Sequence, residues 1–590
     1  MKRNLGSGKK PLALAMTGAL AFASMAGCGT AGPEPSPAAL SGALESGIRS
    51  AMRRQGIVGM SAVVVSGGRR VLADGYGFAD KSRKIPVTVD TVFPVASITK
   101  LFTATAVMQL VERGAVDLDS PVSRYLPRMA GPGGPDDAPT VRQLLTHHAG
   151  IQGNIMEGFE LKEPDPTAFR GVPHLVASLP RTSAPDMVFA YCNAGYSVLG
   201  CLVEAAGGTG YTDAVERGIL EPLGMSRTRF FTSLADAEDV VVGYEGRRPV
   251  PVYPMRDIPA GALLSTAADM ERFMGFVFDR GRDGVLGRAA FDEMTRRQNA
   301  HVPLDGGFSI GLGYWLIAPF AADDAFVSHA GDIPPCHSVL VTIPGRRIGV
   351  FLAANSSRDP QALIPLAVEL VRAVYVEQTG KAIDDPPLAP RVRLDPIDLE
   401  RIAGRYASPL GLLEVNVGRG KLLTRIQGAP VELVPRADGS FSPELSLLGV
   451  LSVPVAPLKK VSFGRFESGG KTCLRITALG IMAGVAEQLS AAEVPEAWKA
   501  RAGRYAIVPR GANAAYRWPR DVALEVDRRT GLLLLSYTFA GQRAPFPLVA
   551  LNDGEAVIAG AGTGLGDAVA AHEEGGDTFL EWAGLLLKRE

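Results

Sequence analysis

A run of mostly apolar residues, Leu101–Val111, constrains this chain more than any other feature. Its apolar side chains would surround a helix on all sides, so the sequence predicts a helix buried inside a large domain that ends near Gly114. Ser97 and Lys100 come just before this run, at the i, i+3 spacing that places two side chains on one face of a helix. We therefore expect a serine hydroxyl beside a lysine amine at the start of a buried helix.

This pair has the chemistry of a nucleophile and a base. Burial lowers the pKa of a lysine amine, because the charged form loses its hydration, and a neutral amine can take a proton from a serine. A serine–lysine pair at this spacing is common by chance, so the prediction needs partners elsewhere in the chain.

Length and charge limit the classes of function. A chain of 590 residues with 46% hydrophobic residues is expected to form several domains. Lys+Arg and Asp+Glu are both 61, so no net positive charge would attract a nucleic acid, and we expect no nucleic-acid partner. Neither a C-x-x-C pair nor an H-E-x-x-H pattern occurs, and we expect no metal and no cofactor.

The amino terminus has the features of an export signal. Basic residues precede an apolar segment, Leu12–Met25, that is shorter than the ~20 residues of a membrane-spanning helix. The following Ala26-Gly27-Cys28 resembles the lipobox of bacterial lipoproteins. The resemblance implies a lipoprotein signal peptide over 1–27, a lipid on Cys28, a linker over 28–40 and anchoring to the bacterial cell envelope. An ordinary secretory signal is the alternative.

The next region reads as one α+β domain. A helix over 40–52 and a β-hairpin over 60–72 come before Ser97, and a second hairpin over 338–353 and a helix over 361–376 come after a long helical stretch. We expect an antiparallel sheet built from both ends of the region, flanked by helices and interrupted by a helical insertion.

Two further motifs fall inside this region. Tyr191-Cys192-Asn193 comes just before a predicted helix, and His329-Ala330-Gly331 lies at the end of a predicted strand. With Ser97-Ile98-Thr99-Lys100, their order resembles that of the penicillin-recognising serine hydrolases: class C β-lactamases, D,D-carboxypeptidases, D-aminopeptidases and related esterases. The resemblance covers about 41–385 and implies a β-lactamase-like domain.

The same resemblance implies roles for the site residues. Ser97 would attack a carbonyl, and Lys100 or Tyr191 as phenolate would take its proton; the sequence does not separate these two. Asn193 would orient the lysine and the substrate, and Gly331 would let the substrate lie along a strand edge. The backbone N–H groups of Ser97 and Asp332 would bind the oxyanion. We interpret His147 and His148 as a structural pair at a helix end.

His329 bears on substrate choice. Relatives that recognise a carboxylate usually carry lysine here, whereas histidine with a pKa near ~6.5 is mostly neutral at physiological pH. We therefore expect an aminopeptidase, amidase or esterase that acts on small acyl, D-aminoacyl or short peptide substrates. A β-lactamase or D,D-carboxypeptidase is the alternative, and a weakly active penicillin-binding sensor or peptide-binding lipoprotein is a second one.

The last third of the chain contains an internal repeat. Ala403-Gly404-Arg405-Tyr406 returns as Ala502-Gly503-Arg504-Tyr505, and each copy is followed by short alternating apolar segments with glycine turns. We expect two small antiparallel β-barrel or sandwich domains, over 390–495 and 496–590. A catalytic domain followed by two such domains resembles the layout of bacterial D-aminopeptidases.

Overall fold

The computed structural model describes residues 37–590 apart from short gaps. The gaps are 132, 154, 306–307, 317–323, 360, 382–387, 427–428, 448–450, 454–457, 459–460, 469, 479–480, 491–492, 511–512, 516–518 and 540–541. The predicted signal peptide and the predicted lipid site at Cys28 lie outside the described residues. Among the residues described, no helix has both the length and the apolar character needed to cross a bilayer.

A six-stranded antiparallel sheet forms the centre of the first domain. The strand order is β10-β11-β12-β1-β2-β3, so strands from both ends of the region pair with one another, and the predicted sheet is confirmed. The strands are β1 (Gly59–Ser66), β2 (Arg69–Asp80), β3 (Ile85–Pro86), β10 (Val327–Ile333), β11 (Cys336–Ile343) and β12 (Ile348–Ala354). Because β10 is an edge strand, one side of its backbone faces away from the sheet.

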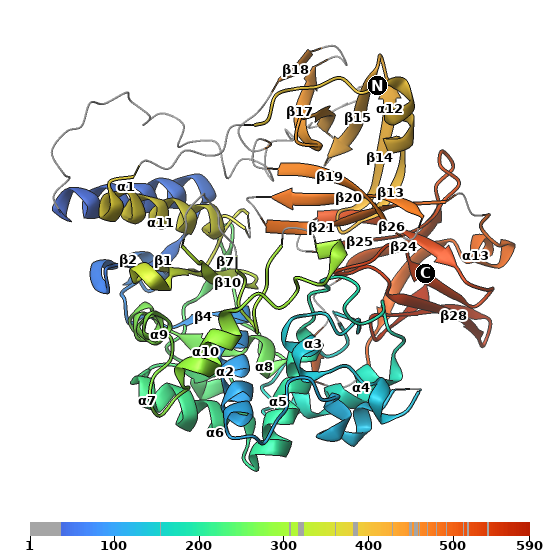
Figure 1. Cartoon of the computed structure of the whole chain (residues 1–590). Helices are drawn as coiled ribbons and strands as arrows, with labels where there is room; N and C mark the ends of the chain where they lie inside the picture. The colour runs from blue at the N-terminus through green and yellow to red at the C-terminus, as the bar shows by residue number, and fades with distance from the viewer. Residues whose placement is uncertain are drawn as a thin grey trace, which may run out of the picture.

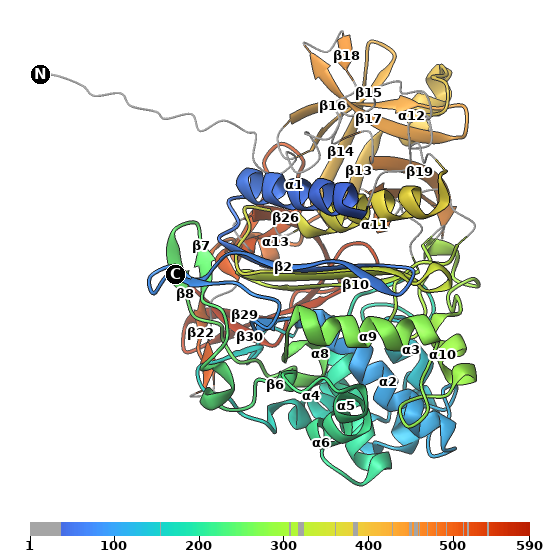
Figure 2. The ribbon, with the colours of Figure 1, turned by 90° about the vertical axis from the view of Figure 1, so that its left-hand side faces the viewer.

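Helices cover both faces of this sheet (Figures 1 and 2). On one face lie α1 (Pro37–Gln55) and α11 (Leu363–Thr379), which share a buried apolar cluster with the sheet. The other face carries the helical insertion and its small strands. These helices are α2 (Thr99–Glu112), α3 (Val141–Leu145), α4 (Val172–Ser178), α5 (Asn193–Gly207), α6 (Tyr211–Val215), α7 (Glu221–Leu223), α8 (Ile258–Gly261), α9 (Ala267–Asp279) and α10 (Arg288–Thr295). The short strands are β4 (Phe93–Pro94), β5 (Glu160–Leu161), β6 (Arg229–Phe230), β7 (Gly243–Glu245), β8 (Arg248–Val250) and β9 (Leu263–Ser265).

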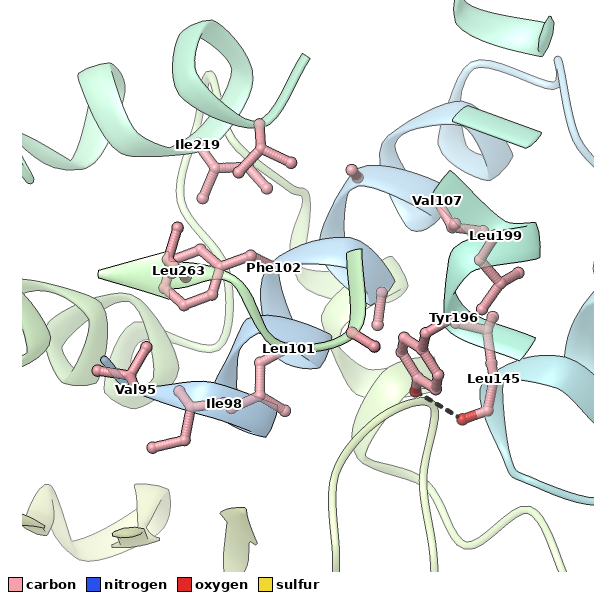
Figure 3. Close-up of a cluster of buried hydrophobic side chains, with 14 of the residues drawn as sticks. Val95, Ile98, Leu101, Phe102, Val107, Leu145, Tyr196, Leu199, Ile219 and Leu263 are labelled. Atoms are coloured by element: carbon pink, nitrogen blue, oxygen red, sulfur yellow. Dashed lines mark hydrogen bonds between the residues drawn. The ribbon is translucent and has the colours of Figure 1, made fainter. Parts of the chain in front are cut away.

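The helix α2 runs through the middle of the larger apolar core, as its composition predicts. Phe102 stacks on Phe273 with ring centroids 4.5 Å apart, and the side chains around α2 come from several elements (Figure 3). The Tyr196 hydroxyl in this core donates to the Leu145 carbonyl at 2.9 Å, which satisfies the one polar atom of a buried ring. This packing fixes the position of α2 and therefore of the residues at its start.

Two closed, eight-stranded antiparallel barrels follow, which confirms the prediction of two small β domains. The first begins with α12 (Pro396–Ile402) and closes where β17 pairs with both β16 and β19. Its strands are β13 (Gly404–Ser408), β14 (Gly411–Gly418), β15 (Lys421–Ile426), β16 (Ala429–Pro435), β17 (Ser440–Leu447), β19 (Val461–Ser468), β20 (Lys471–Ala478) and β21 (Ile481–Gln488), with β18 (Leu451–Val453) as an extra edge strand.

The second barrel begins with α13 (Glu496–Ala500) and closes where β22 pairs with β30. Its strands are β22 (Gly503–Val508), β24 (Arg520–Val526), β25 (Leu533–Phe539), β26 (Gln542–Ala550), β27 (Glu555–Ile558), β28 (Ala568–Glu574), β29 (Asp577–Trp582) and β30 (Leu585–Arg589). A further strand, β23 (Ala514–Ala515), leaves this barrel and pairs with β5 of the first domain. The second barrel is thus joined to the helical insertion by backbone hydrogen bonds.

Candidate active site

Ser97 lies in a single 3₁₀ turn, Ala96–Ile98, that immediately precedes α2. The sequence predicts Ser97 and Lys100 on one helix; in the structure only Lys100 belongs to α2. Ala96 has a φ of +48°, a backbone conformation that residues other than glycine rarely adopt. The Val95 carbonyl holds this turn by accepting hydrogen bonds from the Ile98 N–H at 3.2 Å and the Ser338 hydroxyl at 2.8 Å. The strained turn separates the serine from the helix and leaves its side chain partly exposed.

The Lys100 amine is fully buried beside Ser97. Its Nζ lies 3.1 Å from Ser97 Oγ, 2.8 Å from Asn193 Oδ1 and 2.8 Å from the Ala260 carbonyl oxygen. Burial lowers the pKa of Lys100 to about 7, and the charge of Asp257 opposes this effect. Arg256 takes up much of the Asp257 charge through a buried ion pair at 2.9 Å.

These contacts suit a neutral amine with a defined orientation. A neutral lysine has two N–H groups and one lone pair. The Asn193 and Ala260 oxygens can only accept, so they take the two N–H groups. The lone pair then faces the third neighbour, the Ser97 hydroxyl, which is the one of the three that can donate a proton.

Tyr191 is a further polar neighbour of Ser97. A hydrogen bond with Ser97 lowers the pKa of the Tyr191 hydroxyl, but burial is the larger effect and raises it well above its ordinary value. Lys100 Nζ lies 4.9 Å from the centroid of the Tyr191 ring. The arrangement therefore favours a neutral phenol at this position. It favours Lys100 over a Tyr191 phenolate as the base, a choice that the sequence left open.

The loop that carries Tyr191 is held by the two histidines of the preceding segment. His147 Nδ1 accepts the Cys192 N–H at 3.0 Å, and the His147 ring packs 4.5 Å from the Tyr191 ring. His148 pairs with the buried Asp305 at 2.8 Å, and the other Asp305 oxygen accepts the Phe189 N–H at 2.7 Å. The side chains of the histidines thus hold the tyrosine loop, while their backbone N–H groups donate to the Leu144 and Gln143 carbonyls at the end of α3, the helix end where the sequence predicts them.

Asn193 is the first residue of α5, and the cap in front of it fixes its backbone. The side chain of Cys192 accepts the Gly195 N–H at 3.1 Å, and the Asn193 N–H donates to the Gly153 carbonyl at 3.2 Å. The structure therefore brings Ser97, Lys100, Tyr191 and Asn193 together from three separate elements.

His329 differs from what its sequence position suggests. It is 1% exposed, its ring stacks on Trp315 at 4.8 Å, and Nδ1 lies 2.7 Å from the Ala330 carbonyl oxygen. Burial and then the charge of Lys100 lower the pKa of His329 to about 3. A histidine that titrates near 6.5 is the expectation from sequence; the structure instead shows a ring that is neutral throughout the physiological range.

Gly331 is required by a contact inside the domain. A Cβ at this position would lie 2.1 Å from the Val95 carbonyl oxygen and 2.4 Å from Ser338 Oγ. The sequence predicts that Gly331 leaves room for a substrate, whereas the structure shows that it leaves room for the turn that carries Ser97. Glycine is needed here because the strand β10 passes directly beside that turn.

Beyond Ser328, no strand that the structure describes pairs with the outer edge of β10. Ser328 and Trp315 exchange both backbone hydrogen bonds at 2.9 Å, which shows that Ser328 faces outward. Residues two and four positions further on face the same way in an antiparallel strand, so Ala330 and Asp332 direct their N–H groups away from the sheet. The Asp332 side chain is exposed and lies near enough to raise the pKa of Tyr191.

The second barrel supplies a residue that the sequence analysis missed. Thr563 lies in the loop between β27 and β28, and its hydroxyl oxygen accepts the Tyr191 N–H at 2.9 Å. Gly566 in the same loop fits against the first domain, since a Cβ there would lie 2.3 Å from the Thr182 carbonyl oxygen. The sequence signal that could have indicated this loop is a glycine at every second position of 560–566. All four of these glycines have positive φ.

Comparison with known proteins agrees with this geometry. The family model described as Beta-lactamase matches residues 44–372, more than half of the chain. This chain belongs to the β-lactamase family of serine hydrolases. Penicillin-binding protein 4 of Amycolatopsis lactamdurans is 30% identical over 366 residues, which are 58% of this chain and 91% of that protein. Protein flp of Staphylococcus aureus is 25% identical over 323 residues, 53% of this chain and 62% of its own length.

Solved structures share the β-lactamase-like fold and extend the likeness into the barrels. A crystal structure of SurE matches with a TM-score of 0.57 and 24% identity, over 77% of this chain and 99% of the other. The octameric penicillin-binding protein homologue from Pyrococcus abyssi matches with a TM-score of 0.50 and 26% identity, over 76% of this chain and 99% of the other. Both matches cover more of the chain than the β-lactamase-like domain alone.

Proposed function

We propose that this member of the β-lactamase family is an acyl hydrolase that forms an acyl-enzyme on Ser97 and cleaves amide or ester bonds of small acyl or D-aminoacyl substrates. One observation carries the proposal. The Lys100 amine is buried, has a pKa lowered to about 7, and lies 3.1 Å from Ser97 Oγ with its other two contacts on oxygens that only accept.

The chemistry follows from these positions. Ser97 Oγ forms a bond to the substrate carbonyl carbon while its proton moves to Lys100 Nζ. The carbonyl oxygen becomes an oxyanion, whose binding we assign to the backbone N–H groups of Ser97 and Asp332. The C–N or C–O bond then breaks, and the leaving group takes a proton from Lys100, directly or through the Tyr191 hydroxyl. Water completes the cycle by hydrolysing the ester on Ser97.

The charges near the site support an amino-bearing substrate over a carboxylate-bearing one. The neutral His329 offers no cation for a carboxylate, and the exposed Asp332 carboxylate, whose Oδ1 lies 2.9 Å from His337 Nδ1, would repel one wherever His337 is neutral. The same carboxylate would attract the ammonium group of an aminoacyl substrate. SurE, which shares the fold, has been solved with D-Leu, and this makes D-aminoacyl groups the first to test.

A substrate panel tests the proposal. We expect kcat/KM to be higher for D-alanine and D-leucine p-nitroanilides and for p-nitrophenyl acetate than for nitrocefin, with all activities lost in Ser97→Ala. Asp332→Asn keeps the backbone N–H and should raise KM for the D-aminoacyl p-nitroanilides without changing KM for the neutral ester.

A preference for nitrocefin would favour the β-lactamase alternative, which the likeness to penicillin-binding protein 4 supports. A D,D-carboxypeptidase would instead release D-alanine from a D-Ala-D-Ala peptide. Covalent labelling without turnover of any substrate would favour a penicillin-binding sensor.

We also propose, from the sequence alone, that Cys28 carries a lipid and anchors the exported protein to the bacterial cell envelope. Mass spectrometry of the mature protein from cells tests this. A diacylglyceryl group on Cys28 is expected, and an unmodified amino terminus at another residue would contradict it.

A further inference from the structure

A cavity of about 600 Å³ opens at the end of α1, away from Ser97 and its partners. Its walls come from the last turns of α1, the middle of β2, the turn between β7 and β8, and the segment that follows β12. None of the residues of the active site lines it. The cavity is open enough for a small molecule to enter from solvent, and the proposed hydrolase chemistry does not use it.

The wall of this cavity is strongly basic. Five of its side chains are cationic and none is acidic: Arg49, Arg53, Lys81, Arg247 and Arg358. Arg49 pairs with Glu45 at 2.6 Å, outside the cavity. The other four make no ion pair with any residue that the structure describes. Asp74 lies close enough to raise the pKa of Tyr76 but is not part of the wall. Uncompensated cations that line one concave surface create a local attraction for anions.

Contacts in the wall hold two of these cations. The Arg358 side chain lies across the backbone at Gly56, where a Cβ would be 3.2 Å from its Nε. The Arg49 guanidinium lies 5.0 Å from the centroid of the Tyr76 ring. Tyr76 is only 2% exposed and belongs to the apolar core, so it gives Arg49 a fixed surface to pack on.

The cavity also has an apolar side. Met52, Ile57 and Phe78 line it, and Phe78 is 39% exposed, which is high for an aromatic ring in a strand. A ligand that fills the cavity would therefore contact cations with one part and an aromatic ring with another.

We propose that this cavity binds an anionic ligand in which a phosphoryl group is joined to an apolar group. Several cations suit the two negative charges of a phosphate monoester better than the single charge of a carboxylate, and guanidinium groups bind phosphate oxygens in pairs. The apolar group would pack on Phe78.

Two sources offer this chemistry: a soluble phosphate monoester and the headgroup of an anionic lipid. Calorimetric titration of the full chain with phenyl phosphate tests the first source. Cosedimentation with phosphatidylcholine vesicles that contain or lack phosphatidylglycerol tests the second. Inorganic phosphate measures the contribution of the anion without the apolar group.

Two triple variants that each lose three positive charges show whether binding depends on the cavity. Arg53→Gln, Arg247→Gln and Arg358→Gln together remove three cations from the cavity. Arg69→Gln, Arg113→Gln and Arg128→Gln together remove three exposed arginines that line no part of it and make no ion pair with described residues. Phe78→Ala removes the aromatic contact. Fluorophosphonate labelling of Ser97 should be unchanged in all three proteins, because none of these residues contacts the active site, and thermal unfolding shows whether each variant is folded.

We expect saturable binding of phenyl phosphate that weakens at least tenfold in the cavity variant and less than twofold in the control variant. Binding of phenyl phosphate should also weaken with added salt, since salt screens the attraction between exposed charges. Phe78→Ala should weaken phenyl phosphate but leave inorganic phosphate unchanged. If phosphatidylglycerol vesicles bind through the cavity arginines and phenyl phosphate does not, the ligand is a lipid headgroup. The proposal is overturned if neither probe binds saturably, or if the control variant loses as much affinity as the cavity variant.

Discussion

Lys100 determines the chemistry of this site, because its surroundings favour a neutral amine. The residue lies at the start of a helix that is buried on all sides, and its three neighbours are Ser97 Oγ, Asn193 Oδ1 and the Ala260 carbonyl oxygen. The sequence predicted burial from the apolar run that follows Lys100 and the Ser97 contact from the i, i+3 spacing. It did not predict Ala260, because a backbone carbonyl 160 positions away leaves no trace in a local pattern.

Lys100→Met tests the assignment of the base. Methionine fills nearly the same volume without an amine, so we expect the folded structure to persist while acylation of Ser97 slows at least a thousandfold. Single-turnover acylation and thermal unfolding measure the two effects. A variant that acylates at the wild-type rate but binds substrate weakly would show that Lys100 is a binding residue.

His329 shows where reasoning from residue type fails. Its pKa depends on burial, to which the stacked Trp315 ring contributes, and this burial follows from packing across the sheet edge rather than from the motif. Because its pKa is lowered to about 3, His329 stays neutral between pH 5 and 8. We expect the ratio of kcat/KM for nitrocefin to that for p-nitrophenyl acetate to stay constant over this range. A ratio that rises as the pH falls from 7 to 5 would show that the histidine becomes charged and attracts the carboxylate.

At the scale of elements, the strand β10 and the turn before α2 form one unit. The strand, the second hairpin and the helix after it were predictable, because alternation of apolar residues and glycine turns marks them in the sequence. The close approach of Gly331 to Val95 was not predictable, since it depends on how an edge strand passes a turn more than two hundred residues earlier.

Gly331→Ala tests this contact. The added methyl group would lie 2.1 Å from the Val95 carbonyl oxygen, so the strand or the turn must move. We expect a loss of about 1–3 kcal/mol in the free energy of unfolding, as for an overpacked core, together with slower labelling of Ser97. Gly345→Ala is the matched control, because a Cβ there comes no closer than 4.0 Å to another atom. Equal stability of the two variants would contradict the account of Gly331.

At the scale of the whole molecule, the second barrel completes the loop that carries Tyr191. The repeat in the last third of the chain predicted two β domains, and the structure shows two closed barrels. The sequence did not indicate that the second one reaches the site, because the contact from Thr563 joins residues 372 positions apart. Alternate glycines in 560–566 are the only local sign of that contact.

Asp567, at the end of the same loop, links this contact to pH. It is buried, and burial raises its pKa to about 7 although the side chains of Gln152 and Trp582 act in the opposite direction. A carboxyl with a raised folded-state pKa stays protonated to a higher pH in the folded protein than in the unfolded chain. The stability that it contributes is therefore present below about pH 4 and is lost as the pH rises through 7.

The contribution of Asp567 to the free energy of unfolding should fall by about 1.4 kcal/mol per pH unit between pH 5 and 7, whereas buried groups with lowered pKa values, such as His329, add the opposite slope equally to wild type and variant. Asp567→Asn cannot ionise and should lose this dependence, becoming more stable than the wild type at pH 8. Differential scanning calorimetry of both proteins across this range is the measurement. Parallel pH profiles would show that Asp567 does not titrate in the folded protein.

The central claim, a serine activated by a neutral buried lysine, is tested most directly by the rate at which a fluorophosphonate labels Ser97 at different pH values. With a Lys100 pKa of about 7, the neutral fraction rises about thirtyfold between pH 5.5 and 8.5. We predict a single adduct, mapped to Ser97 by peptide mass spectrometry, that forms about thirtyfold faster at pH 8.5 with a midpoint near 7, and no adduct in Ser97→Ala. An adduct on another residue, or labelling of Ser97 at a rate that does not change with pH, would contradict the account.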